Sequence, residues 1–247
     1  IYNPAMPGSR FGVTADTLGN ALPDGIEGLH FHALCESSSH DLQKVLAAFE
    51  KRFGHLLPQI KWVNMGGGHL MTREGYDTDH LIGLIKDFRQ RYPWLKVILE
   101  PGSAFTWRTG DLLASVVDIV ENDGIKTAIL DVSFACHMPD TLEMPYKPTV
   151  TESLSDEEAA SLPPASIHTY RFGGNSCLSG DFMGDWHFRQ PLKIGDRLTL
   201  KDMNHYTTVK TNMFNGIQHP AIILFDTDGN PVYRRDFTYS DYKSRMG

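Results

Sequence analysis

The stretch Ile60-Lys61-Trp62-Val63-Asn64-Met65-Gly66-Gly67-Gly68 joins a short apolar run to three consecutive glycines. The apolar run predicts a strand, and the glycines mark the point where that strand ends. Runs of the same kind lie upstream at residues 28–34, which have the pattern of a buried strand, and downstream at residues 96–99. Polar or glycine-rich segments follow all three runs, so the three predicted strands end in similar ways.

Helical segments separate these predicted strands. After the first strand, apolar residues recur at helical spacing, namely Leu42, Val45, Leu46 and Phe49. After the second, a helix is predicted to begin near Asp77, with an apolar face formed by Leu81, Leu84, Ile85 and Phe88. Alternation of strands and helices indicates a parallel sheet, either doubly wound or closed into a barrel. A complete eightfold barrel takes about 250 residues, so a barrel here would lack its first strands, whereas a smaller open sheet would need no further segment.

The second half of the chain has a different pattern. Two long β-like runs open it, at residues 112–120 and 127–134, and short alternating strands follow. The turn Asp228-Gly229-Asn230-Pro231 predicts a hairpin. Residues 151–165 contain Ser, Asp, Glu and two prolines, which predicts an exposed loop. We therefore expect an α/β part over residues 1–110 and a mainly β part over residues 111–247.

Composition excludes several classes of protein. The chain has 247 residues, 41% of them hydrophobic, and a formal net charge of −7. A negative chain without a basic patch argues against nucleic-acid binding. No apolar stretch approaches the ~20 residues of a membrane span, and no secretory signal is visible at the start. The three cysteines, Cys35, Cys136 and Cys177, form no C-x-x-C pair, which favours reduced thiols in the cytoplasm over disulfides or structural zinc.

Three chemically distinctive features follow the three predicted strands: His32, the glycines 66–68, and Glu100-Pro101-Gly102. Each alone has an ordinary explanation, as a core histidine, a turn or a loop. In parallel α/β folds, however, the carboxyl ends of the strands are where ligands bind. Glycines let backbone N–H groups approach a phosphate, a carboxylate keeps a pyridine nitrogen protonated, and an imidazole can stack on the ring. Together these features indicate a site for pyridoxal 5'-phosphate (PLP).

The same motifs resemble those of a known family. The segments Phe31-His32-Ala33, Gly66-Gly67-Gly68 and Glu100-Pro101-Gly102 are similar to the ring-stacking, phosphate-binding and pyridinium-binding motifs of the fold-type III decarboxylases, which include ornithine and diaminopimelate decarboxylases. Residues 174–181 resemble the cysteine-containing loop of that family. Residues 205–207, together with 214–216, resemble the segment of that family whose tyrosine contacts the cofactor phosphate. Further stretches resemble the carboxynorspermidine (carboxyspermidine) decarboxylases of polyamine biosynthesis, namely residues 63–70, 100–107, 130–134, 136–140 and 206–211.

This resemblance implies a partial alanine-racemase-like (β/α)8 barrel followed by an all-β C-terminal domain, with PLP as the cofactor. It implies that His32 stacks on the pyridine ring and that Glu100 pairs with the ring nitrogen. The residues that it places at the phosphate are Gly66, Gly67, Gly68, Gly102 and Tyr206. Cys35 stands where some relatives have a phosphate-binding serine, and Ser103 where ornithine decarboxylases have arginine.

The resemblance also implies a homodimer with shared active sites, because the loop that carries Cys177 reaches the partner's site. Cys177 is then expected to protonate the carbon that loses carbon dioxide, or to help position it. Asp131 and Asp181 are candidates for binding the ammonium groups of a carboxylated polyamine, although a turn or surface role is an equal alternative for each. Leu178 stands where diaminopimelate decarboxylases have glutamate, which favours a polyamine substrate.

The Schiff-base lysine of the family has no counterpart in this sequence. Lys61 lies at the amino end of its predicted strand, and the remaining lysines of the first half lie in helical segments or flank strands, namely Lys44, Lys51, Lys86, Lys96 and Lys126. We expect the lysine upstream of Ile1, in an earlier part of the barrel. The chain alone is then expected to bind PLP weakly and to decarboxylate little or not at all.

Two alternatives remain open at this point. The chain could be an inactive paralogue, or a fragment of the same fold, that acts as a dimer partner for an active subunit. It could also be a metal-dependent hydrolase, since His30 and His32 lie on the same face of a strand and an H-x-H pair can bind zinc. His69, Asp131 and His137 could complete such a site.

Overall fold

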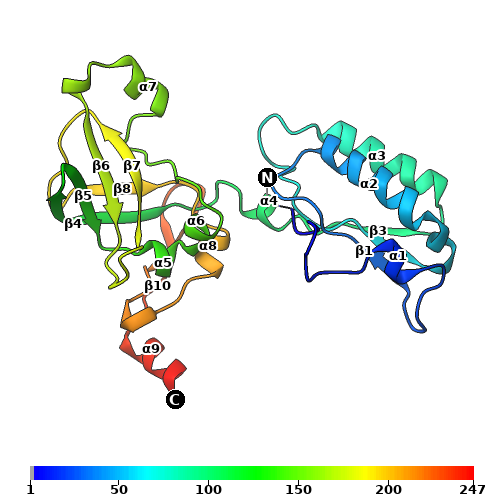
Figure 1. Cartoon of the computed structure of the whole chain (residues 1–247). Coiled ribbons are helices and arrows are strands. Elements are labelled where there is room, and N and C mark those ends of the chain that lie inside the picture. The colour runs from blue at the N-terminus through cyan, green and yellow to red at the C-terminus, as the bar shows by residue number, and fades with distance from the viewer. Residues whose placement is uncertain (1–2) are drawn as a thin grey trace. The chain divides into compact units, whose positions relative to one another are not determined.

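A computed structural model describes residues 3–247 of the chain. It contains two compact units, Ile1–Trp107 and Arg108–Gly247 (Figure 1). The first unit carries a parallel sheet with helices, and the second is built mainly from antiparallel strands. The predicted order of an α/β part followed by a mainly β part is therefore confirmed.

The sheet of the first unit has three parallel strands in the order β1-β2-β3. Their bounds are Gly28–His30, Trp62–Asn64 and Lys96–Ile98. The register pairs Leu29 with Val63, and Val63 with Val97. The strand predicted over residues 28–34 is shorter than expected, and it is not buried as expected, because its first residues are half-buried and His30 is exposed.

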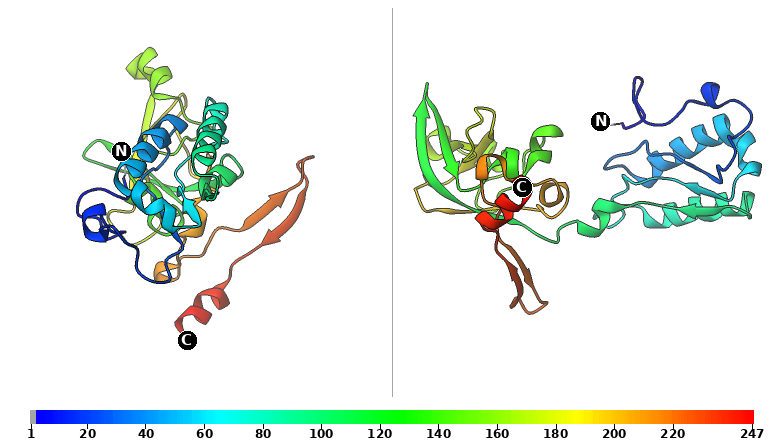
Figure 2. Two further views of the ribbon diagram at one scale, coloured as in Figure 1. Left: turned by 90° about the vertical axis from the view of Figure 1, so that its right-hand side faces the viewer. Right: turned by 90° about the horizontal axis from the view of Figure 1, so that it is seen from below.

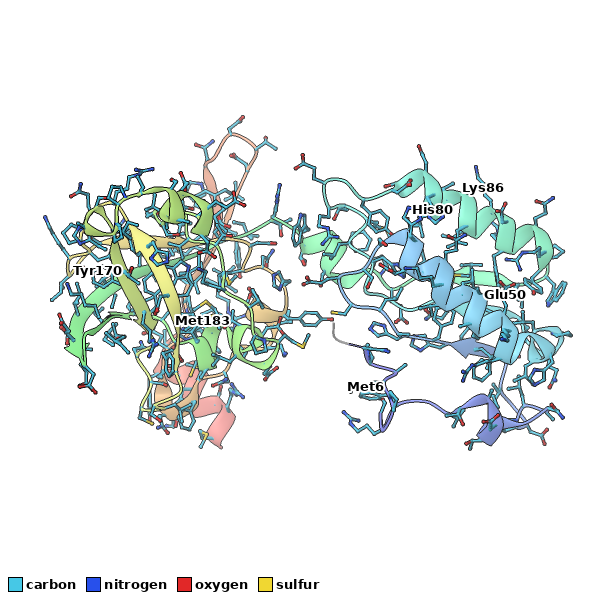
Figure 3. All side chains as sticks on the ribbon, turned by 45° about the horizontal axis from the view of Figure 1, so that its top comes forward. Met6, Glu50, His80, Lys86, Tyr170 and Met183 are labelled. Atoms are coloured by element: carbon cyan, nitrogen blue, oxygen red, sulfur yellow. The ribbon has the colours of Figure 1, made fainter. Side chains whose placement is uncertain are left out.

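Two long helices lie side by side over one side of this sheet, α2 (Ser39–Phe53) and α3 (Thr78–Arg91) (Figure 1). Figure 3 labels Glu50 on α2 and His80 on α3, and the carboxylate of Glu50 pairs with Arg91. Helix α3 begins where the sequence predicts, because the Asp77 side chain accepts a hydrogen bond from the His80 N–H. Apolar side chains of both helices, including Leu42, Leu46, Leu81 and Phe88, share one core with Val63 of β2. The shorter helices of this unit are α1 (Ala15–Leu18), η1 (Gly54–Gln59) and α4 (Gly102–Thr106).

The second unit is organised around a five-stranded sheet in the order β7-β6-β5-β4-β8. The strand bounds are β4 Leu112–Asn122, β5 Ile125–Leu130, β6 His168–Gly173, β7 Phe182–Phe188 and β8 Arg197–Leu200. The run predicted over residues 127–134 divides, because β5 ends at Leu130 and Ser133 caps the short helix α5 (Phe134–His137). The core of the unit contains Phe172 and Trp186, whose rings stack with centroids 4.3 Å apart.

The other short helices of this unit are α6 (Pro139–Glu143), α7 (Asp156–Ser161), η2 (Pro164–Ser166), α8 (Tyr206–Val209), η3 (Phe214–Gly216) and α9 (Tyr239–Met246). The prediction of a loop over residues 151–165 is wrong for its centre. Ser155 and Glu158 form a capping box, in which each side chain accepts a hydrogen bond from the other residue's backbone N–H. The capping box stabilises the first turn of α7, although this stretch lacks the long apolar face by which a helix is usually predicted.

The predicted hairpin is confirmed as β9 (Ile222–Phe225) and β10 (Pro231–Arg235), which pair antiparallel. It projects from the rest of its unit (Figure 2), and every residue of both strands is exposed. Among residues 3–247, no helix combines the length and the apolar character that crossing a membrane requires.

Candidate active site

The carboxyl ends of β1, β2 and β3 bring together three of the features predicted from the sequence. Nε2 of His30 lies 3.5 Å from Oε2 of Glu100. One ligand atom each from His30, His32 and Glu100 lie within 4.8 Å of one another. All three side chains are exposed, so they form an accessible polar group at one edge of the sheet. This is the edge at which parallel α/β folds bind ligands.

The orientation of the His32 ring is set by the glycine segment. The N–H of Gly67 donates a hydrogen bond of 3.1 Å to Nδ1 of His32. An imidazole nitrogen that accepts a hydrogen bond carries no proton, so the neutral ring has its proton on Nε2. The ring is therefore held by one edge while its faces stay available for stacking.

Glu100 is held by a residue that the sequence interpretation did not assign to the site. Nδ2 of Asn64 donates a hydrogen bond of 2.6 Å to Oε1 of Glu100. Oδ1 of the same amide accepts the N–H of Gly66 at 2.9 Å. Asn64 is 9% exposed, and its position as a polar residue that ends an apolar strand is the sequence signal for such a role. Oε2 is then the oxygen of Glu100 left for a ligand, with Nε2 of His30 as its neighbour at 3.5 Å.

The three glycines are required by close backbone packing. A Cβ atom at Gly67 would lie 2.2 Å from the carbonyl oxygen of Glu100, and one at Gly68 would lie 2.1 Å from that of Leu34. Gly66 and Gly68 also have positive φ angles of 71° and 84°, which favour glycine. The ends of the three strands therefore come closer together than side chains at these positions would allow.

The predicted phosphate-binding N–H groups differ in their availability. Those of Gly66 and Gly67 donate to Asn64 and His32, and that of Gly102 donates to the carbonyl of Glu100 at 2.9 Å. For the N–H of Gly68, residues 3–247 provide no acceptor. Of the four glycines, Gly68 is thus the one whose N–H is ready for a ligand. Cys35 is half-buried, and its carbonyl accepts the Ser37 hydroxyl at 3.0 Å.

His69 follows directly on the glycines and is 1% exposed. Neither of its ring nitrogens has a hydrogen-bond partner within residues 3–247. Burial, and then the nearby His32, lower the pKa of His69 below its usual value of 6.5, so the ring is neutral near pH 7. The backbone of Met65 acts in the opposite direction on this pKa, and its effect is smaller.

The remaining predicted site residues lie in the second unit. Cys177 is exposed, and Nδ2 of Asn215 donates a hydrogen bond of 3.1 Å to its Sγ. Asp131 is exposed, and its Oδ1 accepts the N–H of Ser115 at 2.7 Å. Tyr206 begins α8 and is 54% exposed, with the ammonium group of Lys210 5.7 Å from its ring centroid.

Asp181 is placed differently from a residue that meets substrate. It is 4% exposed. Its Oδ2 accepts the Ser133 hydroxyl at 2.8 Å and the Ser176 N–H at 3.2 Å, and its Oδ1 accepts the Ala135 N–H at 2.9 Å. Both carboxylate oxygens are thus committed to the protein. This geometry favours the structural alternative for Asp181 over the predicted contact with a substrate amine.

The hydrogen bonds also disfavour a metal centre. The acceptor nitrogen of His32 is occupied by Gly67, and Oε1 of Glu100 is occupied by Asn64. A metal ligand must offer a free lone pair, so His32 would have to give up this bond. His137 is 3% exposed, and its Nδ1 accepts the Ser133 N–H at 3.1 Å. The residues at the strand ends suit a flat ring with a phosphate better than a metal ion.

The site fits PLP on this chain's own geometry. A fixed imidazole face, a carboxylate whose Oε2 faces His30, and a glycine N–H without an acceptor among residues 3–247 lie at one edge of the sheet. These are the groups that a pyridine ring, its protonated nitrogen and its phosphate require. The buried His69 lies directly beside the glycines.

Comparison with known proteins gives the family. The family model described as pyridoxal-dependent decarboxylase, C-terminal sheet domain, matches residues 44–204. The chain is 51% identical over 247 residues to the carboxyaminopropylagmatine decarboxylase of Synechocystis sp., covering all of this chain and 62% of that protein. It is 45% identical over 249 residues to the carboxynorspermidine/carboxyspermidine decarboxylase of Campylobacter jejuni, covering 99% of this chain and 65% of that protein.

Solved structures agree with the sequence matches. The crystal structure of carboxynorspermidine decarboxylase from Campylobacter jejuni, complexed with norspermidine, is similar with a TM-score of 0.85 and 45% identity, over 98% of this chain and 66% of that one. A diaminopimelate decarboxylase structure at 22% identity has a TM-score of 0.71, which supports the fold alone. The barrel-plus-β-domain fold predicted from the sequence is thereby confirmed. The chain spans 62% to 65% of the length of the curated relatives named above, and it belongs to the family of pyridoxal-dependent decarboxylases.

Proposed function

We propose that this chain is part of a PLP-dependent decarboxylase that acts on a carboxylated polyamine. The observation that carries the proposal is the group formed by His32, Glu100 and the glycines 66–68 at the carboxyl ends of β1 to β3. In this group each side chain is oriented by a hydrogen bond from a neighbouring strand end. PLP, when bound, supplies an electron sink for the bond that breaks on decarboxylation.

The residues of the first unit would bind and orient the cofactor. Glu100 would accept a hydrogen bond from the ring nitrogen through Oε2, since Asn64 occupies Oε1. His32 would cover one face of the ring, and the Gly67 hydrogen bond prevents it from turning away. Gly68 would donate its N–H to the phosphate. The proposal also keeps the other residues predicted at the phosphate, namely Gly66, Gly67, Gly102, Cys35 and Tyr206.

The substrate class rests on the relatives. Relatives at 45% and 51% identity are named for carboxynorspermidine or carboxyspermidine and for carboxyaminopropylagmatine. The second name adds a substrate that the sequence motifs alone did not suggest. All three names describe a carboxylated aminopropyl group on a longer cationic chain, so the reacting end is shared and the far end differs. Asp131, exposed in the second unit, is our candidate for binding an ammonium or guanidinium group.

The second unit would supply the proton. We infer that Cys177, exposed on its loop, donates a proton to the carbon that loses carbon dioxide. We also propose that a homodimer forms and that each subunit offers this loop to the partner's site. A cytoplasmic location, suggested by the cysteine usage, belongs to the same proposal. If the chain is instead part of an inactive paralogue, we expect the same dimer contacts but no turnover of substrate.

The test is release of carbon dioxide by the longest natural chain that contains this sequence. We expect turnover of carboxynorspermidine, carboxyspermidine or carboxyaminopropylagmatine, and much less of ornithine or diaminopimelate. A Glu100→Gln variant serves as the inactive control, because it keeps the shape of the side chain and loses the charge. Turnover of diaminopimelate above all three polyamine substrates would contradict the substrate class. No turnover of any of the five would favour the inactive paralogue.

A further inference from the structure

The hydrogen bond between Asn215 and Cys177 joins two loops of the second unit that lie far apart in the sequence. Nδ2 of Asn215 lies 3.1 Å from Sγ of Cys177, although the residues are 38 positions apart. Both residues are exposed, so burial alone does not hold them together. The reason for their contact must lie in how each loop is anchored.

The loop that carries Cys177 is anchored on the start of α5. Asp181 closes this loop, since its carbonyl accepts the Gly174 N–H at 2.7 Å. Its carboxylate binds the hydroxyl of Ser133, which caps α5, and the N–H of Ala135 within that helix. A Cβ atom at Gly174 would lie 2.2 Å from Oδ2 of Asp181, so the loop is tightly closed around this carboxylate.

The loop that carries Asn215 is anchored on the same helix. Nδ2 of Asn212 donates to the carbonyl of Ala135 at 3.0 Å, and its N–H donates to the carbonyl of Cys136 at 2.9 Å. Oδ1 of Asn212 accepts the N–H of Phe214 at 3.0 Å. Helix α5 is therefore a common support. The Ala135 N–H and the hydroxyl of the cap residue Ser133 bind one loop, and the carbonyls of Ala135 and Cys136 bind the other.

The backbone at Asn215 suits this residue type. Its φ and ψ angles are 54° and 25°, in the left-handed region that asparagine and aspartate enter more readily than other residues with a side chain. The side-chain amide can then point at the sulfur while the backbone turns. An amide N–H is a donor that can fix the direction of a thiol without competing for its proton.

We propose that Asn215 is a positioning residue that orients the Cys177 thiol for proton transfer. The role of Cys177 in catalysis rests on the proposed function, whereas the contact between the two loops does not. Asn215 need not touch the substrate, because it acts through the sulfur. The segment Phe214–Gly216 and the segment around Cys177 thus work as one unit supported by α5.

The contact is tested first without any activity measurement. Asn215→Cys places a thiol beside Cys177, and oxidised glutathione can convert the two thiols to a disulfide while being reduced to two molecules of glutathione. We expect peptide mapping by mass spectrometry to find this cross-link in most molecules. Asn230→Cys, an exposed position in the β9–β10 turn, is the matched control and should form no such link. Equal cross-linking in both variants would overturn the proposal.

The functional test uses Asn215→Asp, because aspartate tolerates the left-handed backbone and a carboxylate cannot donate to sulfur. In the longest natural chain we expect kcat to fall about 3- to 10-fold with KM unchanged, the loss of one hydrogen bond of about 1 kcal/mol. In a Cys177→Ala background the same change should have no effect on kcat. Asn230→Asp is the control in both backgrounds and should leave kcat unchanged.

An equal loss in both backgrounds, or a rise in KM alone, would show that Asn215 does not act through Cys177. If Cys177→Ala leaves kcat unchanged, the proton-donor role of Cys177 fails, and the orienting role of Asn215 fails with it, while the cross-link still reports whether the loops meet. The two tests therefore separate a failure of the contact from a failure of the proposed function.

Discussion

Each of the two units of this chain contains a carboxylate that the sequence predicts to be a site residue, and the two carboxylates have opposite environments. The Glu100 side chain is 48% exposed and has one oxygen bound by Asn64. Asp181 is 4% exposed and has both oxygens bound, by Ser133, Ser176 and Ala135. A carboxylate that keeps a free oxygen can bind a ligand, whereas one that is fully satisfied organises the loop around it.

The largest expected effect comes from removing the buried carboxylate. Asp181→Ala leaves the donors of Ser133, Ser176 and Ala135 without an acceptor, so we expect the free energy of unfolding to fall by about 3–5 kcal/mol. Urea denaturation of the variant measures this loss. Asp228→Ala, at an exposed turn position, is the control and should change stability little. If both variants lose the same amount, Asp181 does not anchor its loop.

Glu100→Gln should have the converse effect, on activity rather than on stability. Loss of the charge that faces the ring nitrogen should lower kcat about 100-fold to 1,000-fold. Because the side chain is half exposed, the midpoint of urea denaturation should stay close to that of the unchanged chain. If Glu100→Gln lowers the free energy of unfolding but leaves kcat unchanged, Glu100 has a structural role and not the proposed role in ligand binding.

The stability of the region around α5, to which Asp181 is bound, should depend on pH. Burial, and then the neighbouring His219, lower the pKa of His137 from 6.5 to about 4. Between these values the unfolded chain binds a proton that the folded chain does not, so stability is lost as the pH falls from 6.5 toward 4. We expect the free energy of unfolding to be about 2 kcal/mol lower near pH 5 than near pH 7. His137→Gln should remove most of this difference, and an unchanged slope would contradict the assignment.

The smallest effect tests the close packing at the strand ends. Gly67→Ala places a Cβ against the carbonyl of Glu100, and overpacking of this kind typically costs about 1–3 kcal/mol. Gly83→Ala, in α3 with no atom near the added Cβ, should instead gain up to about 1 kcal/mol. Thermal unfolding compares the two. Equal effects would mean that the glycine segment has no special packing requirement.

Features that depend on local pattern could be predicted from the sequence. The order of strands and helices, the start of α3 at Asp77 and the β9–β10 hairpin follow from apolar spacing, a capping side chain and a turn sequence. The capping box of α7 was also visible, yet six residues without a periodic apolar face did not predict a helix. The run over residues 127–134 was divided by Ser133, whose capping role depends on a helix that periodicity does not reveal.

Features that depend on long-range hydrogen bonds could not be predicted in this way. Asn64 and Glu100 are 36 positions apart, and Ser133 and Asp181 are 48 apart. Motifs placed His32 and Glu100 at the carboxyl ends of two strands of one parallel sheet, and such ends share one edge. Hydrogen-bond partners from other elements decide which carboxylate oxygen stays available to a ligand. The sequence alone does not show these partners, so it predicted a turn role and a substrate-binding role for Asp181 equally well.

The most direct test of the PLP site is borohydride reduction of the longest natural chain that contains this sequence, followed by peptide mapping. Lys61 pairs with Glu27 at the amino end of β2, and Lys96 begins β3, so both lie away from the carboxyl-end group of His32 and Glu100. We therefore predict that the label appears on a lysine outside residues 1–247. Label on a lysine within these residues, or no label at all, would contradict the proposed site.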